Sequence, residues 1–142
     1  MTACRRQRCK TRVEYDGLCP KHLTKELDFL YGRLIHTRDP FCMRCGSNDW
    51  PECSHHISRE RHGTRWDPDN ACIHCKECHV YLTYHPNIHV EWIIDFIGQE
   101  RYEALLDKAY GVRDDTGRRT YPVEPDRPAL LEWLRAETGE AA

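Results

Sequence analysis

The sequence contains no long hydrophobic run, and this absence excludes several classes of protein. Only 39% of its 142 residues are hydrophobic, whereas 31% are charged. The longest apolar stretch is a few residues, far short of a helix that crosses a bilayer. The first ten residues, MTACRRQRCK, also lack the apolar stretch of a secretory signal. We therefore expect one small cytoplasmic domain, with at most a short appendage and no membrane partner.

The sequence also has little net charge, since its formal value is −2. That value argues at first against nucleic acid as a partner, but the charge is unevenly distributed. Residues 1–40 hold nine Lys or Arg against five Asp or Glu, residues 41–80 hold five against six, and residues 81–142 hold seven against twelve. Because a local basic patch decides contact with nucleic acid, the basic N-terminal part is a candidate DNA-binding region. The acidic C-terminal region is a candidate surface for a protein partner.

Cysteine and histidine are abundant, with nine of each. In a reducing compartment, closely spaced cysteines bind metal more often than they pair with each other. Two Cys-x-x-Cys pairs, Cys42/Cys45 and Cys75/Cys78, are separated by 29 residues. Each pair can supply two adjacent corners of a tetrahedral structural Zn²⁺ site. Cys72 and Cys75 also form a Cys-x-x-Cys pair, so the spacing alone does not decide whether Cys72/Cys75 or Cys75/Cys78 supplies the zinc ligands.

A second cysteine group lies near the N-terminus. Its spacing, Cys-x4-Cys-x9-Cys-x2-His, fits a small zinc knuckle with the ligands Cys4, Cys9, Cys19 and His22. The alternative is a set of free thiols in a flexible arm. The first loop of the knuckle carries the basic residues Arg5, Arg6 and Arg8, which could bind DNA phosphates without reading sequence. Contact with another protein is the alternative role for this knuckle.

Hydrophobic spacing and Pro/Gly punctuation predict a mixture of helices and one hairpin. Leucines at near-helical spacing predict a helix within the connecting segment 24–40. Two short segments, 52–57 and 70–74, are predicted to pair as strands, joined by a long arginine-rich link. Further helices are expected from Lys76 to before Pro86, around residues 90–97 and 102–109, and from Pro128 after a linker at 112–127.

Histidines lie within the frame of the second cysteine group. SHHIS places His55 beside His56, Asn70 follows, and CKECH places His79 directly after Cys78. This order suits phosphodiester hydrolysis at a single metal ion. One histidine of the adjacent pair, together with the distant histidine after Cys78, can bind a divalent ion. The other histidine of the pair can deprotonate water, and the asparagine can hold the loop between them.

The stretch from Cys42 to His79 resembles the HNH endonucleases, which are also called ββα-metal or His-Me finger nucleases. Asn70 stands five residues before Cys75, which sets the register in favour of Cys75/Cys78. The phage branch is the most similar, namely NinG-type recombination proteins and recombination endonuclease VII-type nucleases. The resemblance implies a small α+β fold with a zinc-stabilised ββα-metal core at 41–85. An N-terminal zinc knuckle (1–23) and the connecting helix would precede it, and a helical C-terminal extension (86–142) would follow.

The resemblance also implies residue roles. His55 and His79 would bind the catalytic divalent metal, His56 would be the general base, and Asn70 would brace the hairpin loop. The family often has Asp where this chain has His55, and imidazoles suit Mn²⁺, Ni²⁺ or Zn²⁺ better than Mg²⁺. The expected function is that of a metal-dependent DNA endonuclease in phage recombination or DNA processing, located in the host cytoplasm.

The expected substrate is duplex or branched DNA, with phosphate contacts from the loop arginines Arg59, Arg61 and Arg65. Cleavage of both strands would favour a homodimer. The alternative function is that of a non-catalytic, zinc-dependent DNA-binding or adaptor protein.

Overall fold

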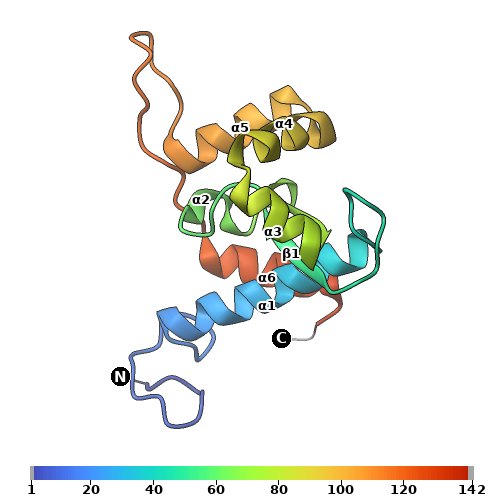
Figure 1. Cartoon of the computed structure of the whole chain (residues 1–142). Coiled ribbons are helices and arrows are strands. Elements are labelled where there is room, and N and C mark those ends of the chain that lie inside the picture. The colour runs from blue at the N-terminus through green and yellow to red at the C-terminus, as the bar shows by residue number, and fades with distance from the viewer. Residues whose placement is uncertain (1, 141–142) are drawn as a thin grey trace. The chain divides into compact units, whose positions relative to one another are not determined.

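A computed structural model of the chain describes residues 2–140 (Figure 1), whereas Met1, Ala141 and Ala142 lie outside the described part. The contacts divide the chain into two compact units, Met1–Leu34 with Asp126–Ala142, and Ile35–Pro125. This division differs from the expected one, because the last helix groups with the N-terminal knuckle and not with the other C-terminal helices. Across residues 2–140, no helix combines the length and apolar character needed to span a membrane.

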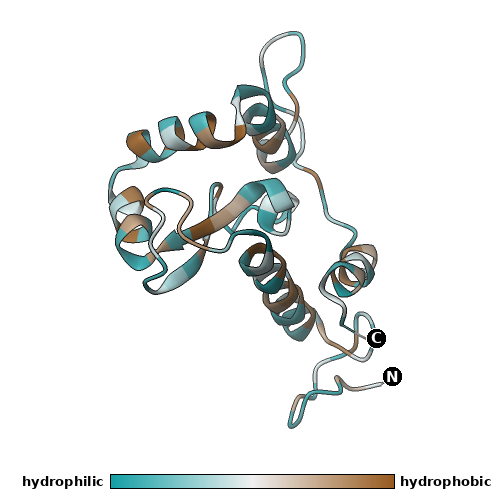
Figure 2. Ribbon diagram, turned by 90° about the vertical axis from the view of Figure 1, so that its right-hand side faces the viewer, coloured by the Kyte–Doolittle hydropathy of each residue, from teal (hydrophilic) through white to brown (hydrophobic). Residues whose placement is uncertain are grey.

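The first unit is built on α1 (Pro20–Arg38), whose last residues belong to the second unit, and on α6 (Arg127–Thr138). Helix α1 begins four residues before the expected start at Thr24, because Pro20 has a backbone angle suited to a first helical turn. The Thr24 hydroxyl therefore lies inside the helix and donates to the Pro20 carbonyl. Figure 2 shows α1 with alternating hydrophobic and hydrophilic surfaces, as the leucine spacing predicted.

Helix α6 belongs to the first unit through polar and apolar contacts. Arg135 donates to Asp16 at 2.7 Å, and Arg127 donates to the carbonyl of Pro20 at 2.7 Å. Leu131 and Leu134 are fully buried. The predicted short helix from Pro128 is confirmed. Its sequence did not indicate which unit the helix belongs to.

The second unit is a small α+β fold around a two-stranded antiparallel sheet. Its elements are β1 (Pro51–His55), α2 (His62–Arg65), η1 (Pro68–Asn70), β2 (Ala71–Cys75), α3 (Lys76–Tyr84), α4 (Pro86–Ile97) and α5 (Gln99–Tyr110). The hairpin prediction is confirmed to within about two residues at each end. The helices that follow it are confirmed as well, but α4 begins at Pro86 and α5 at Gln99, both earlier than expected. Residues 112–126 of the expected linker contain no helix and one isolated bridge, Arg113 to Arg119.

The register of the hairpin decides which side chains share a face. Glu52 lies opposite His74, and Ser54 lies opposite Cys72. The ladder continues beyond β1, because the His56 backbone N–H donates to the Asn70 carbonyl at 2.7 Å. Since side chains alternate along a strand, Glu52, Ser54 and His56 point to one face, whereas His55 points to the other.

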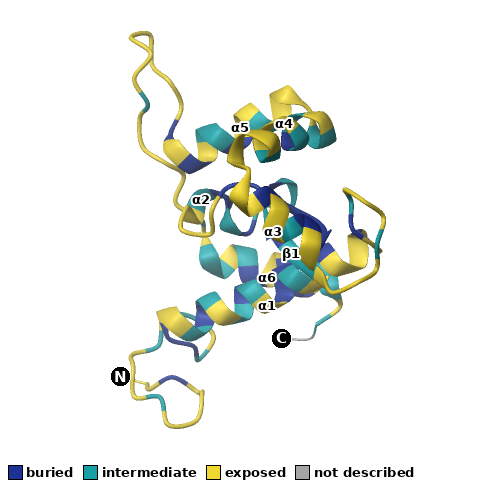
Figure 3. Cartoon of the chain, viewed as in Figure 1, coloured by how far each residue is buried: buried dark blue, intermediate teal, exposed yellow. Residues whose placement is uncertain are grey.

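The free edge of β2 is covered by the chain that follows α1. The Asp39 carboxylate accepts from the Ile73 N–H at 3.2 Å, and the Met43 N–H donates to the Ile73 carbonyl at 2.8 Å. Arg38 donates to the Ala71 carbonyl at 2.6 Å. These contacts satisfy the edge of a strand that is buried throughout (Figure 3) and bring the segment before Cys42 against the hairpin.

Gly63 in α2 is packed too closely for any side chain. A Cβ at this position would clash with the backbone carbonyl oxygen of Lys108 and would lie 2.7 Å from that of Val123. We expect Gly63→Ala to lower the free energy of unfolding by about 1–3 kcal/mol through overpacking. The control is Gly32→Ala in α1, where a Cβ meets nothing within 4 Å. The control should be neutral or stabilising by up to ~1 kcal/mol, and equal urea midpoints for the two variants would contradict the close packing.

Candidate metal centres and a histidine-lined face

Four cysteines of the second unit gather at one point. The Sγ atoms of Cys42, Cys45, Cys75 and Cys78 all lie within 4.8 Å of one another. Cys45 and Cys75 have their sulfurs 3.6 Å apart, and all nine cysteines of the chain are free thiols. A tetrahedral zinc ion with bonds of about 2.3 Å places its sulfur ligands about 3.8 Å apart. The four thiols therefore form a fitting tetrathiolate metal site.

The local fold explains this gathering. Cys42 and Cys45 lie on a tight turn closed by a 2.8 Å bond from the Gly46 N–H to the Cys42 carbonyl. Cys75 ends β2 and caps α3, where its Sγ accepts from the Cys78 N–H at 3.4 Å. Burial raises the pKa of Cys42, but backbone N–H donors outweigh it and bring that pKa to about 6. At neutral pH this thiol is therefore mostly the thiolate that a metal requires.

Cys72 lies outside the tetrathiolate cluster, which resolves the register in favour of Cys75/Cys78. Its side chain is fully buried, and its Sγ is 3.4 Å from Nε2 of His74. Burial raises its thiol pKa well above the ordinary range. Cys72 is therefore a protonated core residue.

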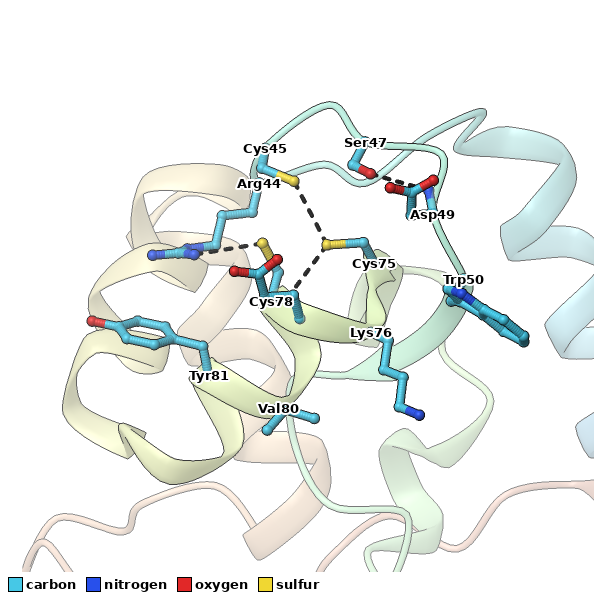
Figure 4. Close-up of a pocket in the computed structure, with 11 residues that line it drawn as sticks. Arg44, Cys45, Ser47, Asp49, Trp50, Cys75, Lys76, Cys78, Val80 and Tyr81 are labelled. Carbon is cyan, nitrogen blue, oxygen red and sulfur yellow. Dashed lines mark hydrogen bonds between the residues drawn. The ribbon is translucent and has the colours of Figure 1, made fainter.

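The outer side of the tetrathiolate cluster is lined by Arg44 and Tyr81 (Figure 4). One guanidinium nitrogen of Arg44 lies 3.5 Å from Cys78 Sγ, and the guanidinium carbon lies 4.8 Å from the centre of the Tyr81 ring. A cation in this position offsets part of the negative charge of the thiolates. Trp50 lies at the rim of the same pocket and is mostly exposed.

The N-terminal group forms a second candidate metal centre. Ligand atoms of Cys4, Cys9, Cys19 and His22 all lie within 4.8 Å of one another. The sulfurs of Cys9 and Cys19 are 3.8 Å apart, and Nδ1 of His22 is 3.2 Å from Cys19 Sγ. These separations again match the edges of a tetrahedral site. The early start of α1 places His22 on its first turn, close to the three thiols.

Four histidines and one carboxylate gather on one side of the hairpin and on the helices above it. We call this the histidine-lined face, and its members are Glu52, His56, His74, His79 and His89. His79 on α3 has its Nδ1 2.5 Å from Oε2 of Glu52. An Nδ1–H that donates to a carboxylate leaves the lone pair on Nε2, which is the arrangement of metal-binding histidines.

The role of Glu52 beside His79 was missed in the sequence. A signal for it existed, because Glu52 lies four residues before His56 and the alternation of a strand places both on one face. His74 on β2 is fully buried, and His89 is partly buried on α4.

His56 lies under α4. Its ring centre is 6.3 Å from that of His89, 6.1 Å from that of Trp92 and 6.3 Å from that of Phe96. Burial, followed by the neighbouring His89 and His74, lowers the pKa of His56 to about 3. The ring is therefore neutral at pH 7 and has a lone pair, but in this conformation it is enclosed.

His55 points to the face of the hairpin opposite to that of Glu52 and His56, because adjacent residues of a strand alternate. There its Nε2 lies 3.0 Å from the Arg65 carbonyl. The expected pairing of His55 with His79 as metal ligands stays a prediction, and Glu52 is the carboxylate that contacts His79.

Asn70, to which the resemblance assigns a bracing role, is fully buried at the end of the arginine-rich loop. Its side-chain oxygen accepts from the Ile57 N–H at 2.8 Å. Its side-chain nitrogen donates to the carbonyls of Ile57 and Thr64, each at 3.0 Å. These bonds join the two ends of the loop directly after His56 and hold the loop in one conformation.

The three loop arginines have different surroundings. Arg61 lies over the Tyr110 ring, with its guanidinium carbon 4.6 Å from the ring centre. Arg65 donates to the Arg59 carbonyl at 3.2 Å. Arg59 is exposed, and its side chain has no hydrogen bond or ion pair with the part of the chain that the structure describes.

The basic residues of the N-terminal knuckle are partly engaged within their own unit. Arg5 pairs with Asp16 at 3.2 Å, and Arg6 pairs with Glu26 at 2.6 Å. Arg8 is exposed and has a positive φ of 64°. Exposed ion pairs contribute about 0–1 kcal/mol, so a phosphate could replace the carboxylate partner of either arginine.

Comparison with known proteins adds no neighbour to this description. No protein-family model, no curated protein and no solved structure matches the chain. A functional assignment therefore depends on the chemistry of the two cysteine centres, the histidine-lined face and the arginine loop.

Proposed function

We propose that this protein is a metal-dependent endonuclease that hydrolyses phosphodiester bonds in DNA. The observation that carries the proposal is the histidine-lined face, where His79, oriented by Glu52, shares one side of the hairpin with His56. A cysteine centre that fits Zn²⁺ and the loop braced by Asn70 flank it. The resemblance to HNH endonucleases names the same elements, and we assign β1, β2 and α3 to a ββα-metal core.

The residues of this face can divide the chemistry between them. A divalent metal bound at Nε2 of His79 would offset the charge that develops on the phosphate. Glu52 holds the ring of His79 in the required tautomer. His56 would accept a proton from water while the water oxygen bonds to phosphorus and the bond to the 3′ oxygen breaks. Imidazole and carboxylate donors suit Mn²⁺, Ni²⁺ or Zn²⁺, and a site with so few oxygen donors suits Mg²⁺ less.

The enclosure of His56 sets a condition for this reaction. Trp92 and Phe96 stack on each other with ring centres 4.7 Å apart, and their ring centres lie 6.1 and 6.3 Å from that of His56. Water and a phosphate reach His56 only when α4 moves away from the hairpin. We therefore propose that DNA binding accompanies a displacement of α4.

The cysteine centres have a structural role in this account. Each has the donor set and spacing of a Zn²⁺ site, and a unit with so small an apolar core needs such a cross-link. DNA would be held by the loop arginines and by Arg8 of the knuckle, which leaves the acidic C-terminal region for a protein partner.

A second candidate function is supported by the burial of His56. A zinc-dependent DNA-binding or adaptor protein needs no exposed base, and an enclosed His56 suits it. In that case the two cysteine centres and the arginines would act in binding alone.

A cleavage assay separates the two candidates. Purified protein is incubated with supercoiled, linear and branched DNA in the presence of Mg²⁺, Mn²⁺, Ni²⁺ or Zn²⁺, at several salt concentrations. The nuclease proposal predicts nicked or linear product with at least one metal, less product at high salt, and none with excess chelator. DNA binding without cleavage under every condition would favour the second candidate.

A further inference from the structure

Three histidines from separate elements lie near one another beneath α4. His56 follows β1, His74 lies on β2 and His89 lies on α4. The ring centre of His89 is 6.3 Å from that of His56 and 6.5 Å from that of His74. His89 is therefore the neighbour that the other two rings share.

Ring nitrogens of all three residues lack partners. Both nitrogens of His56, Nδ1 of His74 and Nε2 of His89 are buried, with no hydrogen-bond partner anywhere in residues 2–140. A buried polar atom without a partner costs about 1–3 kcal/mol, and native proteins rarely leave several together. Four such atoms in one cluster indicate a bound species that supplies the missing interactions.

The chemistry of the cluster restricts that species. Cys72 Sγ lies 3.4 Å from Nε2 of His74, so Nδ1 is the nitrogen of that ring left for a ligand. Burial is the main cause that lowers the pKa of each ring, which keeps all three neutral at pH 7. Neutral imidazoles with free lone pairs are the preferred donors of divalent transition metals.

We infer that His56, His74 and His89 form a third metal site, which takes a divalent transition metal such as Zn²⁺, Ni²⁺ or Co²⁺. The cluster is more open than the two cysteine centres, whose ligand atoms all lie within 4.8 Å of one another. Histidines that share one metal have ring centres about 5–6 Å apart. Rotations about the side-chain torsions would bring the ring nitrogens to one metal ion, and water would supply a fourth ligand.

A metal in this site joins α4 to the hairpin. It would also occupy a nitrogen of His56 and withdraw that residue from proton transfer, a consequence that depends on the proposed nuclease function. Binding of the metal itself does not depend on that function. An excess of the same ion should therefore inhibit cleavage, whereas loss of His89 should remove this inhibition.

The test counts metal ions. Protein with both cysteine centres filled by Zn²⁺ is titrated with Co²⁺, and bound cobalt is measured by its visible absorption and by elemental analysis. In a His79→Ala background, which lacks the proposed catalytic metal ligand, the site predicts one Co²⁺ per chain beyond the zinc, and adding His89→Ala or His74→Phe should lower its affinity at least 10-fold. His36→Ala removes an exposed histidine of α1 and should leave it unchanged.

Separate variants distinguish this site from the proposed catalytic one. His79→Ala should retain the additional Co²⁺, because His79 is not among its ligands. Far-ultraviolet circular dichroism confirms that each variant is folded. Absence of the additional ion in folded His79→Ala, or its retention at equal affinity when His89→Ala is added, would overturn the site. Either result is independent of DNA cleavage, so an inactive protein still decides this question.

Discussion

Replacing Cys75 with serine should remove the metal from the tetrathiolate cluster and unfold residues 35–125. Cys75 joins the end of β2 to the start of α3 and lies 3.6 Å from Cys45 on the opposite turn. Structural zinc sites bind with apparent free energies of about 10–16 kcal/mol, which is comparable to the whole stability of a small domain. Elemental analysis should show one zinc ion fewer per chain. Thermal unfolding followed by circular dichroism should lose the cooperative transition of residues 35–125.

The matched control is Cys72→Ala on the same strand. Cys72 is equally buried but lies outside the cluster, so its loss leaves only a small cavity. The control should keep its zinc and lose about 1–2 kcal/mol of stability. If Cys75→Ser keeps the wild-type zinc content and melting temperature, the cluster is not a structural metal site.

The second large effect is expected for His56→Ala, which should reduce the DNA cleavage rate by about 10²–10⁴-fold. His56 extends the hairpin ladder on the face that His79 shares, so its removal takes away the proposed proton acceptor. The zinc content should be unchanged, because His56 belongs to neither cysteine centre. The measurement is the initial rate of plasmid nicking at saturating metal.

His85→Ala is the control for that variant. His85 is an exposed histidine at the junction of α3 and α4, and it should be replaceable with less than a 3-fold change in rate. Cleavage by His56→Ala at the wild-type rate would show that another group accepts the proton. His55, whose ring is held by the Arg65 carbonyl, is the next candidate.

The ends of the helices in the second unit were predictable because local signals determine them, and Gly98 and Gly111 mark the ends of α4 and α5. The start of α4 at Pro86 was not predicted, because Pro86 was interpreted only as the end of the preceding helix. The cysteine centres were predictable for a similar reason, since a Cys-x-x-Cys turn fixes the ligand geometry locally. The start of α1 was misplaced because Thr24 resembles a helix cap, whereas Pro20 starts the helix.

The composition of the histidine-lined face was less predictable. His55 and His56 are chemically equal neighbours, and only the hairpin register decides which of them faces His79. His89 reaches His56 and His74 only through the packing of α4, a contact between distant segments that no spacing rule contains. The resemblance did not indicate Glu52 as the hydrogen-bond partner of His79.

The measurement that tests the central claim most directly is plasmid cleavage by the wild-type protein with its zinc content verified. Supercoiled DNA is incubated with the protein and Mn²⁺, with and without excess chelator, and the nicked fraction is followed over time. We predict metal-dependent nicking that His56→Ala abolishes. Intact plasmid at every protein and metal concentration, together with retained zinc and retained DNA binding, would contradict the account.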